Sequence, residues 1–564
     1  SYPGLSPAER DELADRELSA ERLFITVSPE MQLLYRRCRE AGKRVFFISD
    51  IYLPEAFMTE LLSAFGLQDC DGLYVSSRFR LTKRTGRLFA ELRRREQIRP
   101  GSWIHIGDSF ESDFRIPRKM KIKAIHIPAR TIRSDFVRMD PKAGLKERVL
   151  KAFINNHISC GDPYYEFGFA CFGMFLWGYV NWIAANARRD GIGTLFFLSR
   201  DGFLMKEAFD ICCGEGGIRS AYLEVSRRSL RVPTLWLHCR YEWLLDMLTP
   251  SMRVPLSSFF DGIGLPLTEY LPLAASHGFE AGSCFERKGL SENEGLRALF
   301  EELRPAILEN SKKEFSLLSD YLKEQGVGGR FGIVDIGWSG SMQRFLLDAL
   351  DELGIPASIK GYYVGLADYY KRNEKYRKDL DLSGYLFDFK KNPKDYDCRQ
   401  SFVGLFETLF PEQKGSVERY EKHGSEGARA VRLPYEYASD GRSASEKEPL
   451  EALQRGALDF CRQISAHPFL SSGDFSPKLL FRELYHAGTD PSGRMLAMFG
   501  DFRFIDEKET SRLAAPKALS AYIRDPGSLR NDFLKSRWKT GFLKRLFKVK
   551  LPYQKLYLLM RRLK

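Results

Sequence analysis

Residues 45–49 read VFFIS, and residues 103–113 read WIHIGDSFESD. Around them, short apolar runs alternate with amphipathic helical patterns: GLYVSS (72–77) and KAIHI (123–127) for the runs, and residues 55–65 and 88–95 for the helices. This alternation is typical of a parallel sheet that is covered by helices on both faces. The first part of the chain is therefore expected to be an α/β unit.

A second α/β series follows an apolar stretch, FGFACFGMFLWGYV at residues 167–180. Its apolar runs are LFFLS (195–199), AYLEVS (221–226), GIVDIG (332–337) and GYYVGL (361–366), with a long helical pattern over residues 301–325. The stretch at 167–180 is short for a membrane span, and it alternates aromatic residues with glycines. We expect a buried packing helix there.

The length of 564 residues allows about four domains, and 44% hydrophobic residues are enough for several cores. We predict an α/β protein made of two Rossmann-like parallel-sheet units, a mixed C-terminal region and a basic helical tail. The predicted boundaries are 1–148, 149–395, 396–525 and 526–564. Within the mixed region, the polar residues 422–448 are expected to form a surface excursion.

The net charge of +13 is concentrated at the C-terminal end, where residues 530–564 hold twelve Lys and Arg and a single acid, Asp532. Aromatic residues such as Trp538, Phe542 and Phe547 lie between these cations, a pattern that suits an anionic membrane surface. A solvated or RNA-touching tail is the alternative. Because the rest of the chain is nearly neutral, no specific nucleic-acid partner is expected.

The polar start of the chain and the ten cysteines, none of them in a CxxC pair, indicate a cytoplasmic protein. With its basic tail, it would lie at the inner face of the membrane. The sequence contains no HExxH, GxSxG or GxxxxGK(S/T) motif, which argues against a zinc protease, a serine hydrolase of that type and a P-loop NTPase.

Four polar residues follow strands or precede helices in the first unit: Ser49, Lys83, Asp108 and Asp113. The carboxyl ends of parallel strands share one crevice, so these side chains are expected to converge. A hydroxyl and an ammonium neutralise phosphate oxygens, and carboxylates hold Mg²⁺. Read one by one, Lys83 also suits a solvated basic loop and Asp108 a helix cap.

The order ISDIYLP, LYVSS, LTKRTGRLF and HIGDSFESD resembles motifs II to IV of the haloacid-dehalogenase-like (HAD) phosphohydrolase superfamily. It looks like a bacterial branch that carries a second α/β domain and is often encoded with surface-polysaccharide synthesis. The resemblance implies Ser49 and Lys83 as phosphate-binding catalytic residues and Asp108 and Asp113 as Mg²⁺ ligands. It also implies a sugar phosphate or related envelope precursor as substrate, with glycosyltransferases as partners.

The chain departs from this family in one respect. HAD enzymes attack phosphorus with the first Asp of a DxDx(T/V) motif, and no such motif precedes Val45. DLDLS at 379–383 has similar letters, but it does not follow an apolar strand, so we interpret it as a solvated loop. The start at Ser1 favours truncation over a relic, and we expect these residues to be inactive for lack of the nucleophile.

The second unit offers another candidate site, at glycine turns between strands and helices. Such turns present backbone N–H groups to an anion, and they faintly resemble the phosphate loops of phosphoribosyltransferases, although Ile336 replaces the second acid of that family. Plain strand-to-helix turns are the alternative. The candidates for binding phosphate or a nucleotide sugar are Arg200, Asp201, Arg227, Arg228, Asp335, Ser339 and Ser341.

The sequence thus favours a Mg²⁺-dependent phosphohydrolase or phosphotransferase. It leaves open a non-catalytic scaffold that binds sugar nucleotides beside glycosyltransferases, and a phosphoribosyltransferase-like enzyme centred on Asp335.

Overall fold

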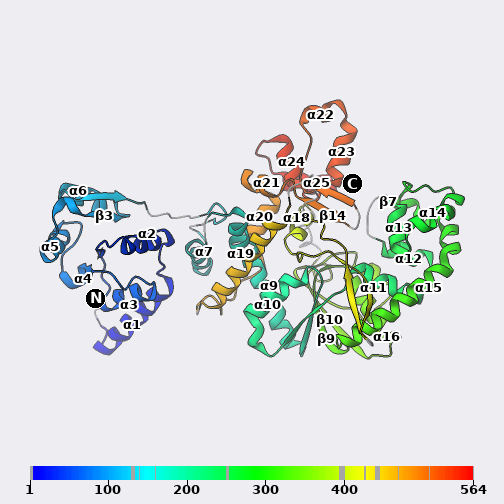
Figure 1. Cartoon of the computed structure of the whole chain (residues 1–564), viewed down its shortest axis with the longest axis horizontal. Helices are drawn as coiled ribbons and strands as arrows, with labels where there is room; N and C mark the ends of the chain where they lie inside the picture. The colour runs from blue at the N-terminus through cyan, green and yellow to red at the C-terminus, as the bar shows by residue number, and fades with distance from the viewer. Residues whose placement is uncertain are drawn as a thin grey trace. The chain divides into compact units, whose positions relative to one another are not determined.

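The computed structural model describes residues 4–128, 134–138, 140, 142–158, 161–248, 253–392, 401–424, 427–438, 445–467, 469–506 and 509–562. The chain divides into two compact units (Figure 1). Unit 1 comprises Ser1–Ile158 with His467–Ser472, and unit 2 comprises Ser159–Ala466 with Gly473–Lys564. The predicted parts 149–395, 396–525 and 526–564 thus fall almost entirely within unit 2, and residues 396–400 lie outside the described residues.

Unit 1 is built from short strands and helices in alternation, as the sequence predicts. Its elements are α1 (Pro7–Phe24), α2 (Pro29–Glu40), β1 (Phe46–Ser49), α3 (Glu55–Ala64), β2 (Gly72–Val75), α4 (Ser76–Phe79), α5 (Arg87–Glu96), β3 (Ile104–Gly107), α6 (Ile116–Lys119), β4 (Lys123–His126) and α7 (Leu145–His157).

The strands of unit 1 form two parallel pairs, β1 with β2 and β3 with β4. Among the described residues no ladder joins the two pairs, so the single sheet that the sequence predicts is not formed. Helix α5 packs against both pairs. Its Leu88 and Leu92 share a core with Tyr74 of β2, and its Phe89 makes an edge-on contact with His105 of β3.

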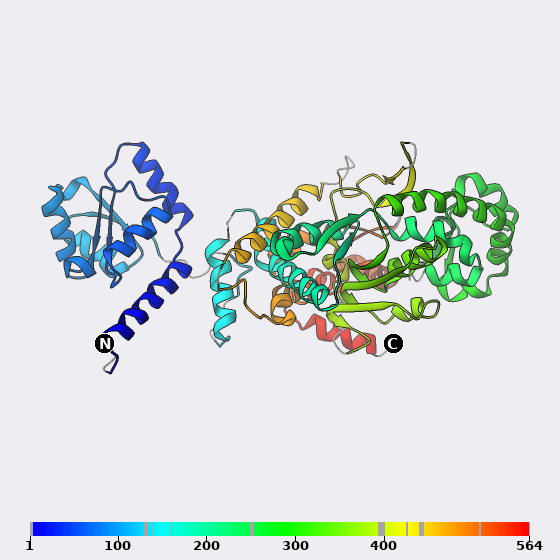
Figure 2. The ribbon, with the colours of Figure 1, turned by 90° about the horizontal axis from the view of Figure 1, so that it is seen from below.

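Unit 2 is organised around a five-stranded sheet with the order β11-β10-β9-β5-β6, in which every neighbouring pair is parallel (Figures 1 and 2). The strands are β5 (Thr194–Leu198), β6 (Arg219–Leu223), β9 (Gly329–Trp338), β10 (Ala357–Leu366) and β11 (Asp381–Asp388). The fold is therefore mixed α/β with a parallel sheet, as predicted.

The chain leaves β5 in two directions. It forms β6 on one side and returns on the other side to form β9, β10 and β11. The helices that follow the strands are α10 (Gly202–Cys213) after β5, α11 (Arg227–Thr234) after β6, and α16 (Ser341–Glu352) after β9. The crossover from β6 to β9 is long and runs through α12 (Tyr241–Met247), β7 (Arg253–Pro255), α13 (Leu256–Ile263), α14 (Leu267–Ser276), β8 (Cys284–Glu286) and α15 (Glu294–Glu324).

The apolar stretch at 167–180 is buried, as predicted. It spans α8 (Pro163–Phe167), a π-helical turn at Gly168–Phe172 and α9 (Gly173–Arg189). Taken together, Pro163–Arg189 is the one helix within the described residues that is long and apolar enough to cross a membrane, and 89% of its most apolar window is buried inside the protein. Phe175 and Tyr179 of α9 pack on Tyr385 of β11.

Residues 379–383 were expected to form a solvated loop, and for most of this segment that expectation is wrong. Asp381, Leu382 and Ser383 begin β11, the edge strand of the sheet, and Leu382 is buried. β11 is an edge strand, and the charged residue at its exposed start interrupts the apolar run by which a strand is recognised in a sequence. In the structure Lys360 Nζ of β10 bonds Asp381 Oδ1 across the ladder (2.5 Å).

The remaining elements of unit 2 lie mostly in the region predicted to be mixed. They are α17 (Tyr370–Glu374), α18 (Val403–Thr408), β12 (Val417–His423), β13 (Gly427–Arg432), α19 (Lys447–Ser465), α20 (Pro477–Thr489), α21 (Gly493–Phe499), β14 (Arg503–Asp506), β15 (Glu509–Arg512), α22 (Leu519–Arg524), α23 (Pro526–Lys535), α24 (Lys539–Phe547) and α25 (Tyr553–Arg562). The predicted surface excursion at 422–448 includes part of an antiparallel hairpin, β12–β13, that packs on α11 and α15.

The basic tail is folded into unit 2. Trp538 is fully buried and Phe542 is 1% exposed, so these side chains are not the membrane anchors that the sequence predicts. Trp538 Nε1 donates to the carbonyl of Gly488 (2.8 Å), and Arg545 pairs with Asp501 (2.8 Å). The large apolar side chains of the tail that remain exposed are Leu534, Phe547, Val549, Leu551, Leu556, Leu559 and Met560.

Candidate functional site

A buried carboxylate, Asp113, is the centre of the polar cluster in unit 1. Lys83 Nζ donates to its Oδ1 (2.5 Å), and His105 Nε2 donates to the same oxygen (2.8 Å). The N–H of Ser109 donates to its Oδ2 (3.0 Å). Burial raises the pKa of Asp113, but the bonds from His105 and Lys83 outweigh burial and hold that pKa well below its usual range.

The cluster ties three chain segments together. Asp50, directly after β1, accepts from the backbone N–H of Lys83 (2.6 Å), and Lys83 in turn reaches Asp113 beyond β3. Gly107 lies under Asp113, because a Cβ at that position would come within 2.5 Å of the carboxylate. The carboxyl ends of β1 and β3 are thereby held at one place.

Of the four residues predicted in unit 1, the structure brings Lys83 and Asp113 into direct contact. Ser49 is the last residue of β1 and Asp108 follows the last residue of β3, where its side chain is exposed. Sequence reasoning did not single out Asp50 or His105. Asp50 could have been found from the sequence, because it lies inside the ISDIYLP string that resembles a family motif. Nothing in the WIHIG string marks His105 as a partner of Asp113.

The two oxygens of Asp113 differ in how they would suit Mg²⁺. Oδ1 accepts from both Lys83 and His105, whereas Oδ2 accepts from the Ser109 N–H, so a metal ion at Oδ2 would not have to displace Lys83 or His105. The other predicted ligand, Asp108, has an exposed side chain. No group of three or more His, Cys, Asp or Glu side chains suited to a metal ion occurs within the described residues.

Unit 2 contains a cavity of about 440 Å³ at the carboxyl edge of its sheet. It lies where the chain leaves β5 in two directions, which is the place where open α/β sheets bind ligands. Of the seven candidates from the sequence, Ser339 is not among the residues that line the cavity. The six that do line it are Arg200, Asp201, Arg227, Arg228, Asp335 and Ser341.

Three helices begin at this cavity. Asp201 precedes α10, Arg227 is the first residue of α11, and Ser341 is the first residue of α16; all three residues line the cavity. The first N–H groups of a helix lack partners inside the helix, and the helix dipole places positive potential there. Three such ends at one cavity make its floor attractive to an anion.

Two carboxylates oppose this positive potential. Burial and the charge of Asp335 raise the pKa of Asp201 to about 8, against the effect of Arg200. Burial also raises the pKa of Asp335 to about 6, although the N–H groups of Gly337 and Ile336 act in the other direction. The Gly337 N–H donates to Asp335 Oδ2 (3.1 Å).

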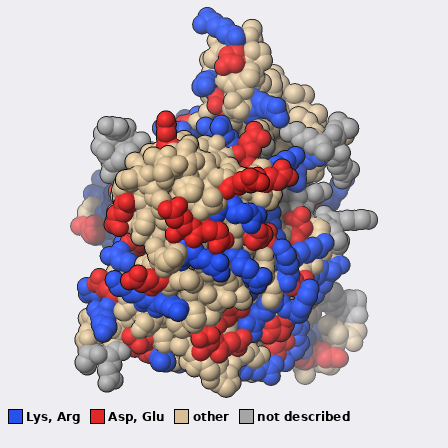
Figure 3. All heavy atoms as spheres, turned by 90° about the vertical axis from the view of Figure 1, so that its right-hand side faces the viewer, with Lys and Arg blue, Asp and Glu red and all other residues tan. Residues whose placement is uncertain are grey.

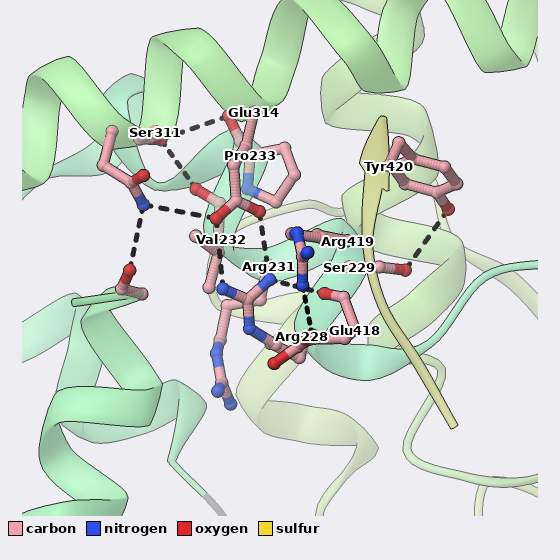
Figure 4. Close-up of polar contacts among 12 residues, drawn as sticks. Arg228, Ser229, Arg231, Val232, Pro233, Ser311, Glu314, Glu418, Arg419 and Tyr420 are labelled. Carbon is pink, nitrogen blue, oxygen red and sulfur yellow. Dashed lines mark hydrogen bonds and ion pairs between the residues drawn. The ribbon is translucent and has the colours of Figure 1, made fainter. Parts of the chain in front are cut away.

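Two of the arginines at the cavity hold protein segments in place. Arg228 forms a two-pronged ion pair with Glu314 of α15 (3.0 and 3.1 Å) and bonds the carbonyl of Glu418 in β12, as Figure 4 shows. Arg200 pairs with Glu436 in the segment that follows β13. Ser311 of α15 also bonds the carbonyls of Val232 (2.6 Å) and Pro233 (3.2 Å), so α11 is fixed against α15.

The turn between β9 and α16 has an uncommon backbone. Gly337, Trp338 and Gly340 have φ values of 96°, 67° and 74°, in the left-handed region. A tryptophan in this region is strained, and such strain is typical of ligand-binding turns. Here Trp338 is held by stacking on Phe387 (5.6 Å) and by donating from Nε1 to Glu407 (2.6 Å).

Several cavity residues come from segments where sequence reasoning placed no site. Glu407 belongs to α18, Glu436 and Tyr437 follow β13, and Phe504 lies in β14. The segment that contains Glu436 was predicted to be a surface excursion, and it lines the cavity instead. No motif marks these residues, because they approach the sheet from far along the chain.

No protein-family model matches the chain, and a search of curated proteins found no match either.

The raised pKa of Asp201 predicts a pH dependence of stability. The pKa is about 8 in the folded protein and 3.8 ordinarily, so the folded state binds more protons between these values. Stability must then fall as pH rises from about 4 to about 8. We expect Asp201→Asn to remove the part of this fall that Asp201 causes and to leave the smaller part that the raised pKa of Asp335 causes. At pH 8 the variant should be the more stable form, by on the order of 5 kcal/mol.

The free energy of unfolding at each pH can be measured by urea unfolding followed by tryptophan fluorescence. The signal reports on unit 2, because six of the seven tryptophans lie there. The exposed Asp474 provides the control, because Asp474→Asn should leave the pH dependence as it is in the wild type. If the free energy of unfolding changes with pH in the same way in the wild type and in Asp201→Asn, the raised pKa of Asp201 is contradicted.

Proposed function

We propose that unit 2 binds a phosphorylated sugar, of which a sugar nucleotide is the best candidate, in the cavity at the carboxyl edge of its sheet. The observation that carries the proposal is the meeting of three helix N-termini at one cavity, together with Arg227. This arrangement suits the phosphates of the ligand. The acids Asp201, Asp335 and Glu407 suit sugar hydroxyls, which donate to carboxylates.

The size and position of the cavity support the same class of ligand. About 440 Å³ lies within the range of small-molecule sites. The parallel sheet with helices after β5, β6 and β9 also supports the finer prediction that unit 2 is Rossmann-like. On the face of unit 2 that includes α14 and α15, Lys and Arg are interspersed with Asp and Glu (Figure 3), so this face does not have the uniformly basic surface that is typical of nucleic-acid binding.

Arginine substitution tests this proposal. We expect the full chain to bind UDP-glucose or GDP-mannose in isothermal titration calorimetry, and Arg227→Gln to weaken binding at least 10-fold, the scale of one charge-assisted hydrogen bond. Arg219 is the matched control because it is exposed and lies at the start of β6, the amino end of that strand, so Arg219→Gln should bind as the wild type does. Equal losses in both variants, or no binding of sugar nucleotides or pyrophosphate by the wild type, would contradict the proposal.

A second function is favoured by the cluster around Asp113. The bond between Lys83 and Asp113 joins the loop before α5 to the segment after β3, which supports the HAD-like interpretation of unit 1. On this interpretation unit 1 is a Mg²⁺-dependent phosphohydrolase unit that lacks its nucleophile.

We expect the 564-residue chain to hydrolyse p-nitrophenyl phosphate no faster than buffer with Mg²⁺, because the covalent phospho-aspartate cannot form. The assay compares the wild type with Asp108→Asn. Turnover that the substitution abolishes would show that the nucleophile is present elsewhere in the chain.

Contact with an anionic membrane also remains a proposal, now limited to the exposed side chains of the tail. Leu559 is 57% exposed on α25, near the cations Lys555 and Arg561. We expect Leu559→Glu to lower co-sedimentation with phosphatidylglycerol vesicles several-fold, since it removes apolar contact and adds a repelled charge. Leu145→Glu is the control at an exposed leucine of unit 1 (67% exposed). Unchanged binding of Leu559→Glu would rule out α25 as the contact.

A further inference from the structure

Two carboxylates at the cavity of unit 2 come from neighbouring strands of the sheet. Asp335 belongs to β9, and Asp201 follows the end of the neighbouring strand β5 by three residues. The two strands are paired in register, with Phe197 opposite Val334, and both aspartates line the same cavity. Asp335 is 9% exposed. The ligand that we propose for this cavity would therefore meet both carboxyl groups.

The charged and tyrosine groups near this pair come from α9, α11, α18 and β10 and from the segments that follow β5 and β13. Arg200 lies next to Asp201, and Arg227 of α11 lowers the pKa of Asp335. Glu407 of α18 raises the pKa of both aspartates, and Glu436 raises that of Asp201. The remaining neighbours are tyrosines: Tyr179 of α9, whose hydroxyl donates to the carbonyl of Asp335 (3.1 Å), Tyr363 of β10, and Tyr437 after β13.

We propose that Asp201 and Asp335 are a proton donor and a proton acceptor for a transfer reaction on the phosphorylated sugar bound in this cavity. The inference rests on the proposed function of unit 2 and adds a reaction to it. It adds an acid–base role to two groups that the binding proposal uses only as hydrogen-bond partners of sugar hydroxyls. A phosphate by itself gains nothing from two buried carboxylates beside it.

The reaction is a substitution at the carbon or phosphorus atom that bears the sugar–phosphate bond. A hydroxyl group of water or of an alcohol acceptor forms a new bond to that atom and passes its proton to Asp335. The bond to the leaving oxygen breaks, its electron pair stays with that oxygen, and Asp201 supplies the proton that neutralises it. One proton is taken up and one is released, so the pair needs no further reactant.

The protonation states of the pair support this division of roles. The pKa of Asp201 is raised to about 8 and that of Asp335 to about 6, so near pH 7 the first is mainly a carboxylic acid and the second mainly a carboxylate. Two acids that neighbour each other but are held in opposite protonation states are typical of donor and acceptor pairs in enzymes.

The experiment measures protons taken up when UDP-glucose binds to the full chain. The diphosphate of UDP-glucose does not titrate near neutral pH, so any uptake belongs to the protein. A bound anion raises the pKa of Asp335, and we expect uptake of about half a proton per ligand near pH 6.5. Isothermal titration calorimetry in two buffers of different ionisation enthalpy gives this number directly.

The variants separate the two carboxylates. Asp335→Asn should bind UDP-glucose and lose most of the uptake, and Asp335→Glu should restore it. Asp201→Asn should keep the uptake, because Asp201 is already protonated at this pH. For the reaction itself, release of UDP from UDP-glucose by the wild type should fall at least 100-fold in both Asn variants while binding persists.

The outcomes distinguish this inference from the proposed function. If UDP-glucose binds, Arg227→Gln weakens it, and the proton uptake is the same in the wild type and Asp335→Asn, the acid–base inference is wrong and the binding proposal stands. Release of UDP that neither Asn variant slows would overturn it as well. If the wild type binds no sugar nucleotide, the proposed function fails first, and the inference fails with it.

Discussion

The structure of unit 2 depends on one topological constraint, the divergence of the chain on either side of β5. Because β6 and β9 pair with opposite edges of the same strand, the helices that follow the strands pack on opposite sides of the sheet, and an opening is left at its carboxyl edge. The starts of α10, α11 and α16 all line this opening. The position of the cavity thus follows from the order of the strands, and the side chains that line it determine which ligand it can bind.

The arginines around the cavity have two different roles. Some hold segments of the protein in place, and another is assigned to the ligand. Arg228 is engaged by Glu314 and Arg200 by Glu436, so these two ion pairs fix α11 and the segment after β13. Arg227, whose charge lowers the pKa of Asp335, is the arginine of this group that we assign to the ligand. Unit 1 shows the same principle on a smaller scale, because the bond from Lys83 to Asp113 fixes the ends of its strands before any ligand is bound.

The sequence predicts the parallel strands and most of the cavity candidates, because both follow from local patterns. Apolar runs locate β5, β9 and β10, and polar residues directly after them must lie at one sheet edge. It does not predict Glu407, Glu436 or Phe504, which reach the cavity through tertiary contacts that no local pattern records. For the same reason the tail was misjudged, since interleaved aromatic and basic residues suit both a membrane surface and a helix such as α24, whose Phe542 is buried in the protein. In unit 1 the motifs point to Lys83 and Asp113, which do meet, while the convergence of Ser49 and Asp108 with them stays a prediction. The local patterns do not predict the absence of a ladder between β1 and β3 among the described residues.

The central claim, that the carboxyl edge of the sheet in unit 2 is a site for a phosphorylated sugar, is tested most directly by a crystal structure of the chain with UDP-glucose. The account predicts electron density for the two phosphates at the starts of α10, α11 and α16, with the Arg227 guanidinium in hydrogen-bond contact and with Asp201 and Asp335 beside the bond between sugar and phosphate. Density for the ligand at any other surface, with this cavity empty at saturating ligand, would contradict it.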